Sequence, residues 1–262
     1  MRPTIYLALV ATVLGVPSAC EHRPVAGHAP ASAVTIAALH DAPAALTRVG
    51  SGRFEMHLSI DGPESSRAVR SFGVFSGGAL AMDIDLEALM AQIAQQPDRP
   101  IPDGLDTRAR VIIHDTTAYV RIPMLHELTG EPGWLSLSST ELGERGSVGF
   151  AATALNPVRL VDTLRGVVGD VQEVGREEVR GVSTTHVTST LLTGQSMDVW
   201  VDAEQLVRRL RVVVDDTSSE LGIVTTTVEL FDFGATVDID VPGPGEFTPF
   251  SDLIREFMVA GA

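Results

Sequence analysis

The sequence contains no lysine: all 19 basic residues are arginine, against 34 acidic residues, and the net charge is −15. Without lysine there is no Walker A phosphate-binding lysine, no Schiff-base lysine and no Ser-x-x-Lys nucleophile pair. The acidic balance disfavours nucleic acid as a partner, because binding it requires a cationic surface that releases counterions. Two tryptophans and two tyrosines also supply few rings for stacking on carbohydrate.

Cysteine is also scarce: Cys20 is the only one in the chain. It follows Arg2, the uncharged apolar run 5–16 and the small residues 17–19, an order typical of a secretory signal peptide. Ser18-Ala19-Cys20 resembles the last three positions of the lipobox of bacterial lipoproteins, whereas Pro17 replaces the aliphatic residue usual there. We predict a signal peptide over 1–19 and lipidation of Cys20. Ordinary cleavage after Ser18 is the alternative.

Lipidation explains an unpaired thiol in an exported chain, where a single cysteine has no partner for an internal disulfide. Each buried CH₂ contributes about 0.8 kcal/mol, so two or three acyl chains would hold the protein on the outer face of the cell membrane. The protein is secreted if Cys20 is not lipidated. No other segment reaches the run of about 18 apolar residues that spans a bilayer.

Behind Cys20, residues 20–39 are rich in Ala, Pro and His and are predicted to be a flexible tether. A domain follows over 40–250, and 251–262 is a C-terminal tail. Apolar and polar residues alternate along the domain, which predicts strands. The clearest of these segments are 54–60, 80–86, 117–122, 134–137, 182–192, 197–201, 207–213, 223–231 and, plainest of all, 235–241.

Three helices are expected between these strands. One precedes the first strand at 38–49, and a second covers 86–96 and is stopped by Pro97. The third opens with Asn156 as N-cap and Pro157 in the first turn. Its apolar stripe comprises Val158, Val161, Leu164, Val167 and Val168. The predicted class is α+β, mostly β: a strongly curved antiparallel sheet, a half-barrel of about eleven strands, covered by two or three helices.

Motifs that carry chemistry are incomplete. His126-Glu127 begins like a zinc-protease helix, but Gly130 occupies the position of the second histidine. Gly146-Ser147-Val148-Gly149 lacks the first glycine of a nucleophile elbow, and a flexible glycine loop is the better interpretation. Loops are predicted at 103–108 and 143–149. The pairs Asp83/Asp85 and Asp238/Asp240 fall on the polar side of alternating segments, where solvation explains them. We expect no catalysis, no metal and no cofactor.

The apolar faces are more informative, because an open sheet needs its inner face covered. The covering residues are aliphatic or methionine, which leave either a filled core or a lined cavity. The candidate lining comprises Phe54, Met56, Leu58, Leu80, Met82, Ile84, Leu89, Met90, Ile93, Val158, Val161 and Leu164. The sequence leaves filled core and cavity both open.

The second half of the chain carries a family resemblance. Residues 174–186, 199–209 and 231–241 read VGREEVRGVSTTH, VWVDAEQLVRR and FDFGATVDIDV. This order is similar to actinobacterial lipoproteins of the LppX/LprAFG type, within the LolA/LolB-like lipoprotein-carrier superfamily. One difference is Gln205, where the turn after Asp202 usually carries glycine. Trp200, Arg208 and Arg209 in these segments are expected to fix the sheet rather than touch a ligand.

The resemblance implies a helix-covered half-barrel with an apolar cavity, in proteins that carry or hold acylated lipids in the envelope. Our first hypothesis is a monomeric, non-catalytic lipoprotein that binds an acylated lipid or glycolipid and contacts the cell membrane through Cys20. The second is an envelope sensor or scaffold with a filled core, which binds a partner protein. A secreted hydrolase is the least supported.

Overall fold

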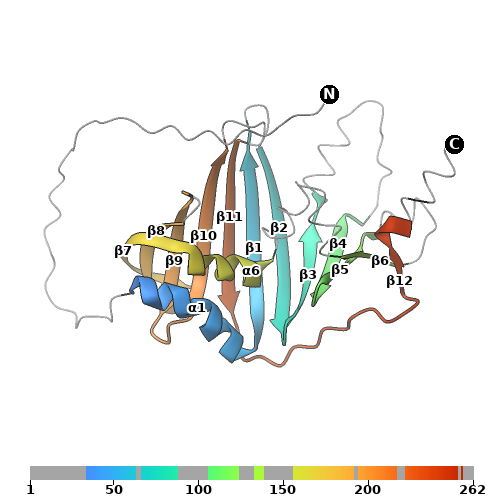
Figure 1. Ribbon diagram of the computed structural model, residues 1–262, viewed down its shortest axis with the longest axis horizontal. Coiled ribbons are helices and arrows are strands. Elements are labelled where there is room, and N and C mark those ends of the chain that lie inside the picture. Colours follow the sequence, from blue (N-terminus) through green and yellow to red (C-terminus); the bar gives the residue numbers. More distant parts are fainter. Residues whose placement is uncertain are drawn as a thin grey trace, which may run out of the picture. The chain divides into compact units, whose positions relative to one another are not determined.

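Twelve strands form one sheet in the part of the chain that the computed structural model describes (Figure 1). The described residues are 34–62, 66–87, 106–123, 133–138, 156–191, 194–216, 222–252 and 255, all within the compact unit Ser32–Ala262. The strand order is β12-β6-β5-β4-β3-β2-β1-β11-β10-β9-β8-β7. All neighbours pair antiparallel except β12 and β6, which are parallel.

Eight of the twelve strands coincide with period-2 segments of the sequence. Their bounds are β1 Ser51–Asp61, β2 Ser66–Ser76, β3 Ala79–Asp85, β4 Arg108–His114, β5 Thr117–Arg121, β6 Trp134–Ser138, β7 Val167–Val179, β8 Val182–Leu191, β9 Ser196–Asp202, β10 Val207–Asp216, β11 Gly222–Phe231 and β12 Phe247–Pro249. The prediction of a mostly β, α+β protein is confirmed, with twelve strands instead of eleven.

One pairing joins the two halves of the sheet. Strands β1–β6 follow one another as a meander, and so do β7–β11. The two meanders meet where β1 pairs with β11, from Arg53 opposite Phe231 to Asp61 opposite Ile223. Within each meander, strands that are neighbours in sequence pair with each other, so this long-range pairing alone joins the two meanders into one sheet.

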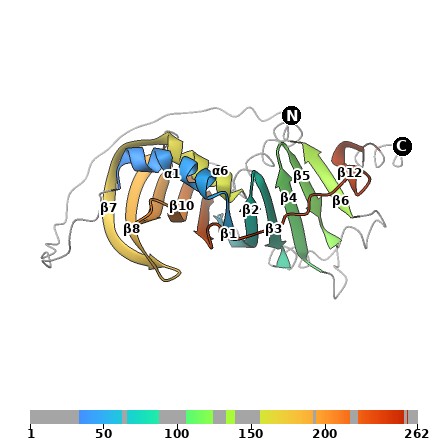
Figure 2. The same ribbon diagram turned by 90° about the horizontal axis from the view of Figure 1, so that it is seen from below.

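The helices lie on one face of the sheet. Helix α1 (Ile36–Val49) is capped by the Thr35 hydroxyl and ends at Gly50. Helix α6 (Pro157–Asp162) begins at the predicted Asn156, whose side chain accepts from the backbone N–H of Val158 and Arg159. The 3₁₀ turn η1 (Thr163–Gly166) follows. Both helices lie against β7–β11 and β1 (Figure 2), and α1 also contacts α6 and η1.

Two helix predictions change. The third helix ends earlier than its stripe suggests: Val167 and Val168 belong to β7, because the chain turns into the sheet at η1. The predicted helix at 86–96 lies outside the described residues beyond Glu87, as do both loop predictions except at their described end, residues 106–108. There Arg108 opens β4 and is not loop. No helix in the described ranges is long and apolar enough to cross a membrane.

The strand predicted at 235–241 is wrong, although its alternation is real. Val237 and Ile239 are half-buried while Asp238 and Asp240 are exposed, yet the segment makes no ladder. It runs past the ends of β1–β5 to reach β12 (Figures 1 and 2). With no strand beside it, the segment keeps its extended pattern without becoming part of the sheet.

The turn after β9 is held by Asp202. Its side chain accepts from the backbone N–H of Glu204 and Leu206 and pairs with Arg208 at 2.6 Å. Within the turn, Gln205 has a φ of +63°, the left-handed conformation that favours glycine. The turn therefore lacks the usual glycine but keeps the left-handed backbone conformation that a glycine would adopt there.

We predict that Gln205→Gly stabilises the protein by about 0.5–1 kcal/mol. The left-handed conformation costs a non-glycine residue roughly 1–2 kcal/mol, and the greater freedom of glycine in the unfolded chain offsets part of the gain. Urea unfolding of both proteins measures the difference. Glu204→Gly, one residue earlier and without a positive φ, should destabilise. A loss of stability in Gln205→Gly would contradict the strain argument.

Gly73 provides close packing on the apolar face. It lies in β2 between Phe54 of β1 and Met82 of β3. A Cβ built there would overlap the Phe54 ring and the carbonyl oxygen of Ala81. The Phe54 ring, only 1% exposed, therefore lies across the glycine.

We expect Gly73→Ala to destabilise the protein by at least about 2 kcal/mol, since either a backbone or a fully buried ring must shift. Gly166→Ala is the matched control: nothing lies within 4 Å of its Cβ position, and it should change stability by less than about 0.5 kcal/mol. Equal effects of the two substitutions in thermal unfolding would refute the packing argument.

Candidate functional site

The candidate lining residues of β1 and β3 are brought onto one face by the register. Phe54 lies opposite Gly73 of β2, which in turn lies opposite Met82. Likewise, Met56 lies opposite Ser71 of β2, which lies opposite Ile84. All six strand positions of the predicted lining are buried, at 9% exposure or less: Phe54, Met56, Leu58, Leu80, Met82 and Ile84. Alternation in the sequence therefore identified the inner face of these strands correctly.

The helical candidates pack on the same apolar core. Val161 is 1% exposed and Leu164 is fully buried, and Val158 packs against the cluster from its edge. Leu89, Met90 and Ile93 lie outside the described residues. The structure thus places three helical and five strand candidates in one cluster, with Leu58 buried on the same face. That this cluster lines a ligand cavity stays a prediction.

The cluster extends further than the sequence indicated. α1 contributes Leu39, and β8–β10 contribute four fully buried side chains, Val187, Met197, Val199 and Leu210. The alternation of these strands was visible in the sequence, but nothing local said which apolar face lies beneath a helix. His40 ties α1 to the sheet, since its Nε2 lies 3.0 Å from the carbonyl oxygen of Val167.

The opposite, outer face carries a polar row. His186, Trp200, Arg209, Glu229 and Glu55 lie directly opposite one another on β8, β9, β10, β11 and β1. The His186 ring stacks on the Trp200 ring with centroids 4.1 Å apart. Arg209 lies over Trp200 and donates to Glu229 at 2.6 Å. Trp200 and Arg209 fix the sheet as the sequence predicted.

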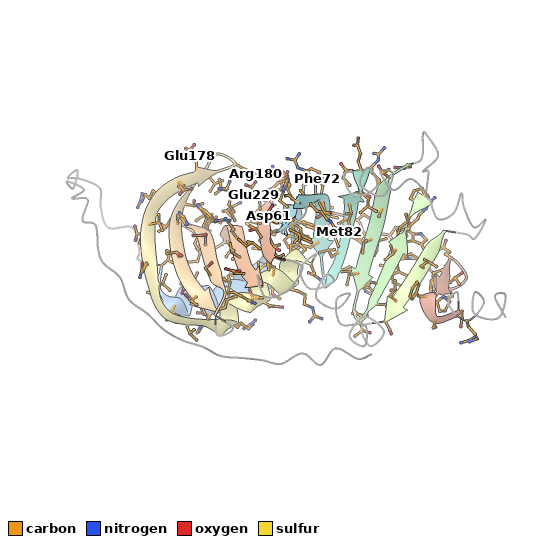
Figure 3. The ribbon with its side chains drawn as sticks, turned by 90° about the horizontal axis from the view of Figure 1, so that it is seen from above. Asp61, Phe72, Met82, Glu178, Arg180 and Glu229 are labelled. Atoms are coloured by element: carbon orange, nitrogen blue, oxygen red, sulfur yellow. The ribbon has the colours of Figure 1, made fainter. Side chains whose placement is uncertain are left out.

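The tip of the β7–β8 hairpin folds onto this row. β9 pairs with β8 only from Thr184 onward, so the tip extends past it. Arg180 at the tip donates to Glu229 at 2.7 Å and to Glu55, and its guanidinium lies 4.0 Å from the centre of the Phe231 ring. Arg180 and Glu229 lie on the face away from α1 and α6 (Figure 3). The tip therefore bridges the β11–β1 junction.

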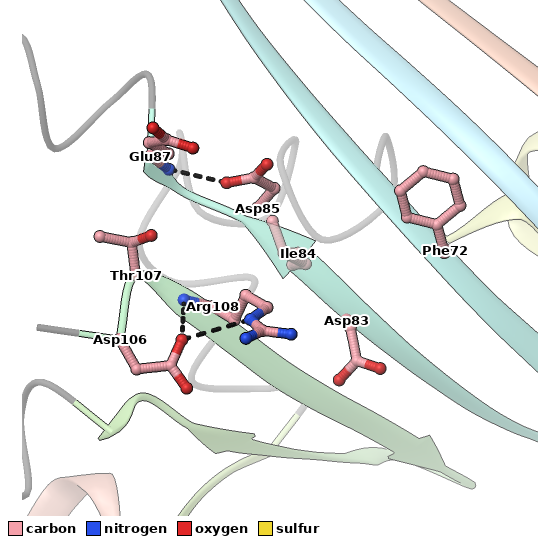
Figure 4. A pocket seen from close by; sticks show the side chains of 8 residues that line it. All are labelled: Phe72, Asp83, Ile84, Asp85, Glu87, Asp106, Thr107 and Arg108. Atoms are coloured by element: carbon pink, nitrogen blue, oxygen red, sulfur yellow. Dashed lines mark hydrogen bonds and ion pairs between the residues drawn. The ribbon is translucent and has the colours of Figure 1, made fainter.

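A pocket of about 740 Å³ opens near the ends of β3 and β4 (Figure 4). Half of its lining residues are acidic, and Phe72 forms one wall: Phe72, Asp83, Ile84, Asp85, Glu87, Asp106, Thr107 and Arg108. Arg108 pairs with Asp106, and Arg110 pairs with Asp83. Asp83 and Asp85 are exposed, as the alternation predicted. Within the described ranges no three His, Cys, Asp or Glu residues are grouped to hold a metal ion.

Glu177 joins the hairpin to the polar row. Its carboxylate accepts from Trp200 Nε1 at 2.9 Å and lies 2.9 Å from His186 Nδ1. The pKa of Glu177 lies below its usual 4.5, and the hydrogen bond from Trp200 is the largest cause. The hydrogen bond and charge of His186 and the charge of Arg209 lower it further, whereas burial acts in the opposite direction. A lowered folded-state pKa means that ionised Glu177 stabilises the fold above the usual pKa, and that this contribution is lost as pH falls through the lowered one.

We predict that Glu177→Gln lowers the melting temperature at pH 6 and that the gap to the unmodified protein closes as the pH falls below 4.5. The loss at pH 6 should be about 0.5 kcal/mol, because the side chain is 45% exposed and solvent screens it. Glu178→Gln, at the exposed neighbouring position, is the control and should leave the profile unchanged. A gap that persists at pH 3 would contradict the assignment.

Two curated proteins of Streptomyces match part of the chain. No family model matches the chain. The chain is 33% identical over 118 residues to SCO4650 of Streptomyces coelicolor, described as a candidate lipoprotein, and 22% identical over 161 residues to an uncharacterised 31.2 kDa protein of Streptomyces griseus. These matches cover 44% and 49% of this chain and 40% and 52% of the relatives, so the chain spans about half the length of the curated relatives it matches.

Two solved structures match most of the chain with TM-scores below 0.5. The lipoprotein LppX of Mycobacterium tuberculosis matches 78% of this chain and 97% of its own, with a TM-score of 0.46 and 14% identity. LprF of Mycobacterium bovis matches 79% and 96%, with a TM-score of 0.45 and 13% identity. The chain is thus similar in sequence to a candidate Streptomyces lipoprotein and in structure to LppX and LprF.

Proposed function

We propose that this protein is a lipid-anchored, non-catalytic lipoprotein of the outer face of the cell membrane, and that it binds an acylated lipid on the inner face of its sheet. The observation that carries the proposal is the continuous apolar cluster formed by β1, β3, α6, α1 and β8–β10. Two helices and one 3₁₀ turn cover the β7–β11 side of that face in the described part of the chain. A helix on a sheet face is a separable cover, unlike a strand held in a ladder.

The binding energy would come from apolar area. Burial of acyl chains contributes about 25 cal/mol per Å², and the gain disappears where the chain re-enters a bilayer, so such a site can load and unload at a membrane. The strongly curved, half-barrel sheet that the sequence predicts would suit this role, and β7 bends around one end of α1 in Figure 2. The aliphatic and methionine composition of the cluster is adaptable to chains of different length.

Lipidation of Cys20 places the protein where such a ligand is available. The candidate lipoprotein of Streptomyces coelicolor supports this part of the proposal through its name. The remaining alternative is a sensor or scaffold lipoprotein. Full burial of Leu39, Leu164 and Met197 favours it, because a core that is already filled leaves its outer face as the place for a partner.

Native mass spectrometry of residues 21–262, secreted from an actinobacterial host, tests the proposal. We expect a reproducible mass excess over the polypeptide, which organic extraction identifies as one class of acylated lipid. Phe72→Ala is the control: this ring is 47% exposed on the outer face, so the variant should carry the same lipid.

Two results would go against lipid binding on the inner face. A bare polypeptide mass, with no uptake when acyl lipids are offered, would leave the scaffold as the better account. Loss of the lipid in Phe72→Ala would move the ligand to the outer pocket of Figure 4.

A further inference from the structure

One buried hydroxyl group on the apolar face has no hydrogen-bond partner. Ser189 is 8% exposed, and its Oγ is the single buried side-chain polar atom without a partner in the described part of the chain. Two other hydroxyls of β8 have partners: Thr184 donates to the carbonyl of Glu177 at 2.7 Å, and Thr188 to that of Met197 at 3.2 Å. An unpaired buried hydroxyl is costly, so it calls for an explanation.

The described side chains next to Ser189 on the same face of β8 and β9 are apolar. Val187 and Leu191 flank it along β8, and Met197 lies opposite it on β9, all three buried. All three belong to the apolar cluster that holds the candidate lining residues. A buried water needs two to four polar partners, which these side chains do not provide.

The sheet is also irregular beside Ser189. The β7–β8 register shifts between Val168 and Gln172, so residues 169–171 of β7 lie opposite Ser189 alone. Bulges of this kind are over-represented next to functional sites, where they re-aim a side chain or interrupt the ladder. η1, the turn that follows α6, contacts β8, and α1 contacts β7 at this side of the sheet.

We propose that the Ser189 hydroxyl donates a hydrogen bond to an ester carbonyl of the bound lipid. This inference rests on the proposed function and adds the chemical class of its ligand: an ester-linked lipid rather than an ether-linked or free hydrocarbon chain. A neutral single acceptor suits the position, because the one buried charged residue in the described ranges is Asp202, which already pairs with Arg208 at a turn.

The test compares two lipids that differ only in the carbonyl. Residues 21–262, which contain the whole compact unit Ser32–Ala262, are offered an equimolar mixture of 1,2-dipalmitoylglycerol and 1,2-di-O-hexadecylglycerol, and native mass spectrometry measures the ratio bound. The unmodified protein should favour the diester about fivefold, the effect of one neutral hydrogen bond. In Ser189→Ala the ratio should fall to about one.

Ser183→Ala is the matched control, the same substitution at an exposed position of the same strand, and it should keep the preference. Ser189→Cys preserves the volume but weakens the donor, so it should give an intermediate ratio and serves if the alanine variant does not fold. A single thermal transition verifies folding of each variant.

The outcomes separate the two proposals. Binding of both lipids with an unchanged ester preference in Ser189→Ala overturns the Ser189 inference and leaves lipid binding intact. Equal binding of the two lipids by the unmodified protein does the same. Binding of neither lipid by the unmodified protein overturns lipid binding and the Ser189 inference with it.

Discussion

The pairing of β1 with β11 is the interaction on which the rest of this structure depends. Each half of the sheet is a meander of sequence neighbours, and this one junction makes the inner faces of the two halves continuous. A slip of one residue there would turn every side chain of one half to the other face. Phe54 and Leu230, opposite each other across the junction, would then lie on opposite faces of the sheet.

The outer face secures the same junction with charge. Glu55 of β1 and Glu229 of β11 lie directly opposite each other, an arrangement of like charges that by itself destabilises a strand pair. Arg180 and Arg209 resolve it, since both donate to Glu229 and Arg180 also reaches Glu55. The β7–β8 hairpin tip therefore acts on a junction three strands from its own position in the sheet.

The two faces divide the work of the molecule. The polar side chains on the outer face pair with one another, which fixes their positions. The inner side is mostly apolar, and among the buried hydroxyls of the described residues only that of Ser189 lacks a hydrogen-bond partner. In a face of that kind an apolar ligand gains free energy over its whole length, whereas one hydroxyl selects among ligands by a single group. Both the lipid-binding proposal and its refinement follow from this division.

The sequence by itself determined the local elements. Period-2 alternation located most strands and their buried sides, because side-chain direction alternates within one strand whatever surrounds it. Asn156-Pro157 marked the start of α6 for an equally local reason. β2, β4, β12 and the first part of β7 were not identified in the sequence, since arginines, glycines or short length blur their alternation.

Only the tertiary structure decided what each element meets. Residues 235–241 alternate as cleanly as any strand, yet no neighbour offers them a ladder, so they stay outside the sheet. The reach of Arg180 to Glu55, and the isolation of Ser189 among aliphatic side chains, likewise depend on residues distant in sequence. Periodicity is a property of residues adjacent in sequence. Strand pairing and the hydrogen-bond partners of polar groups depend on residues distant in sequence, which meet only in the folded chain.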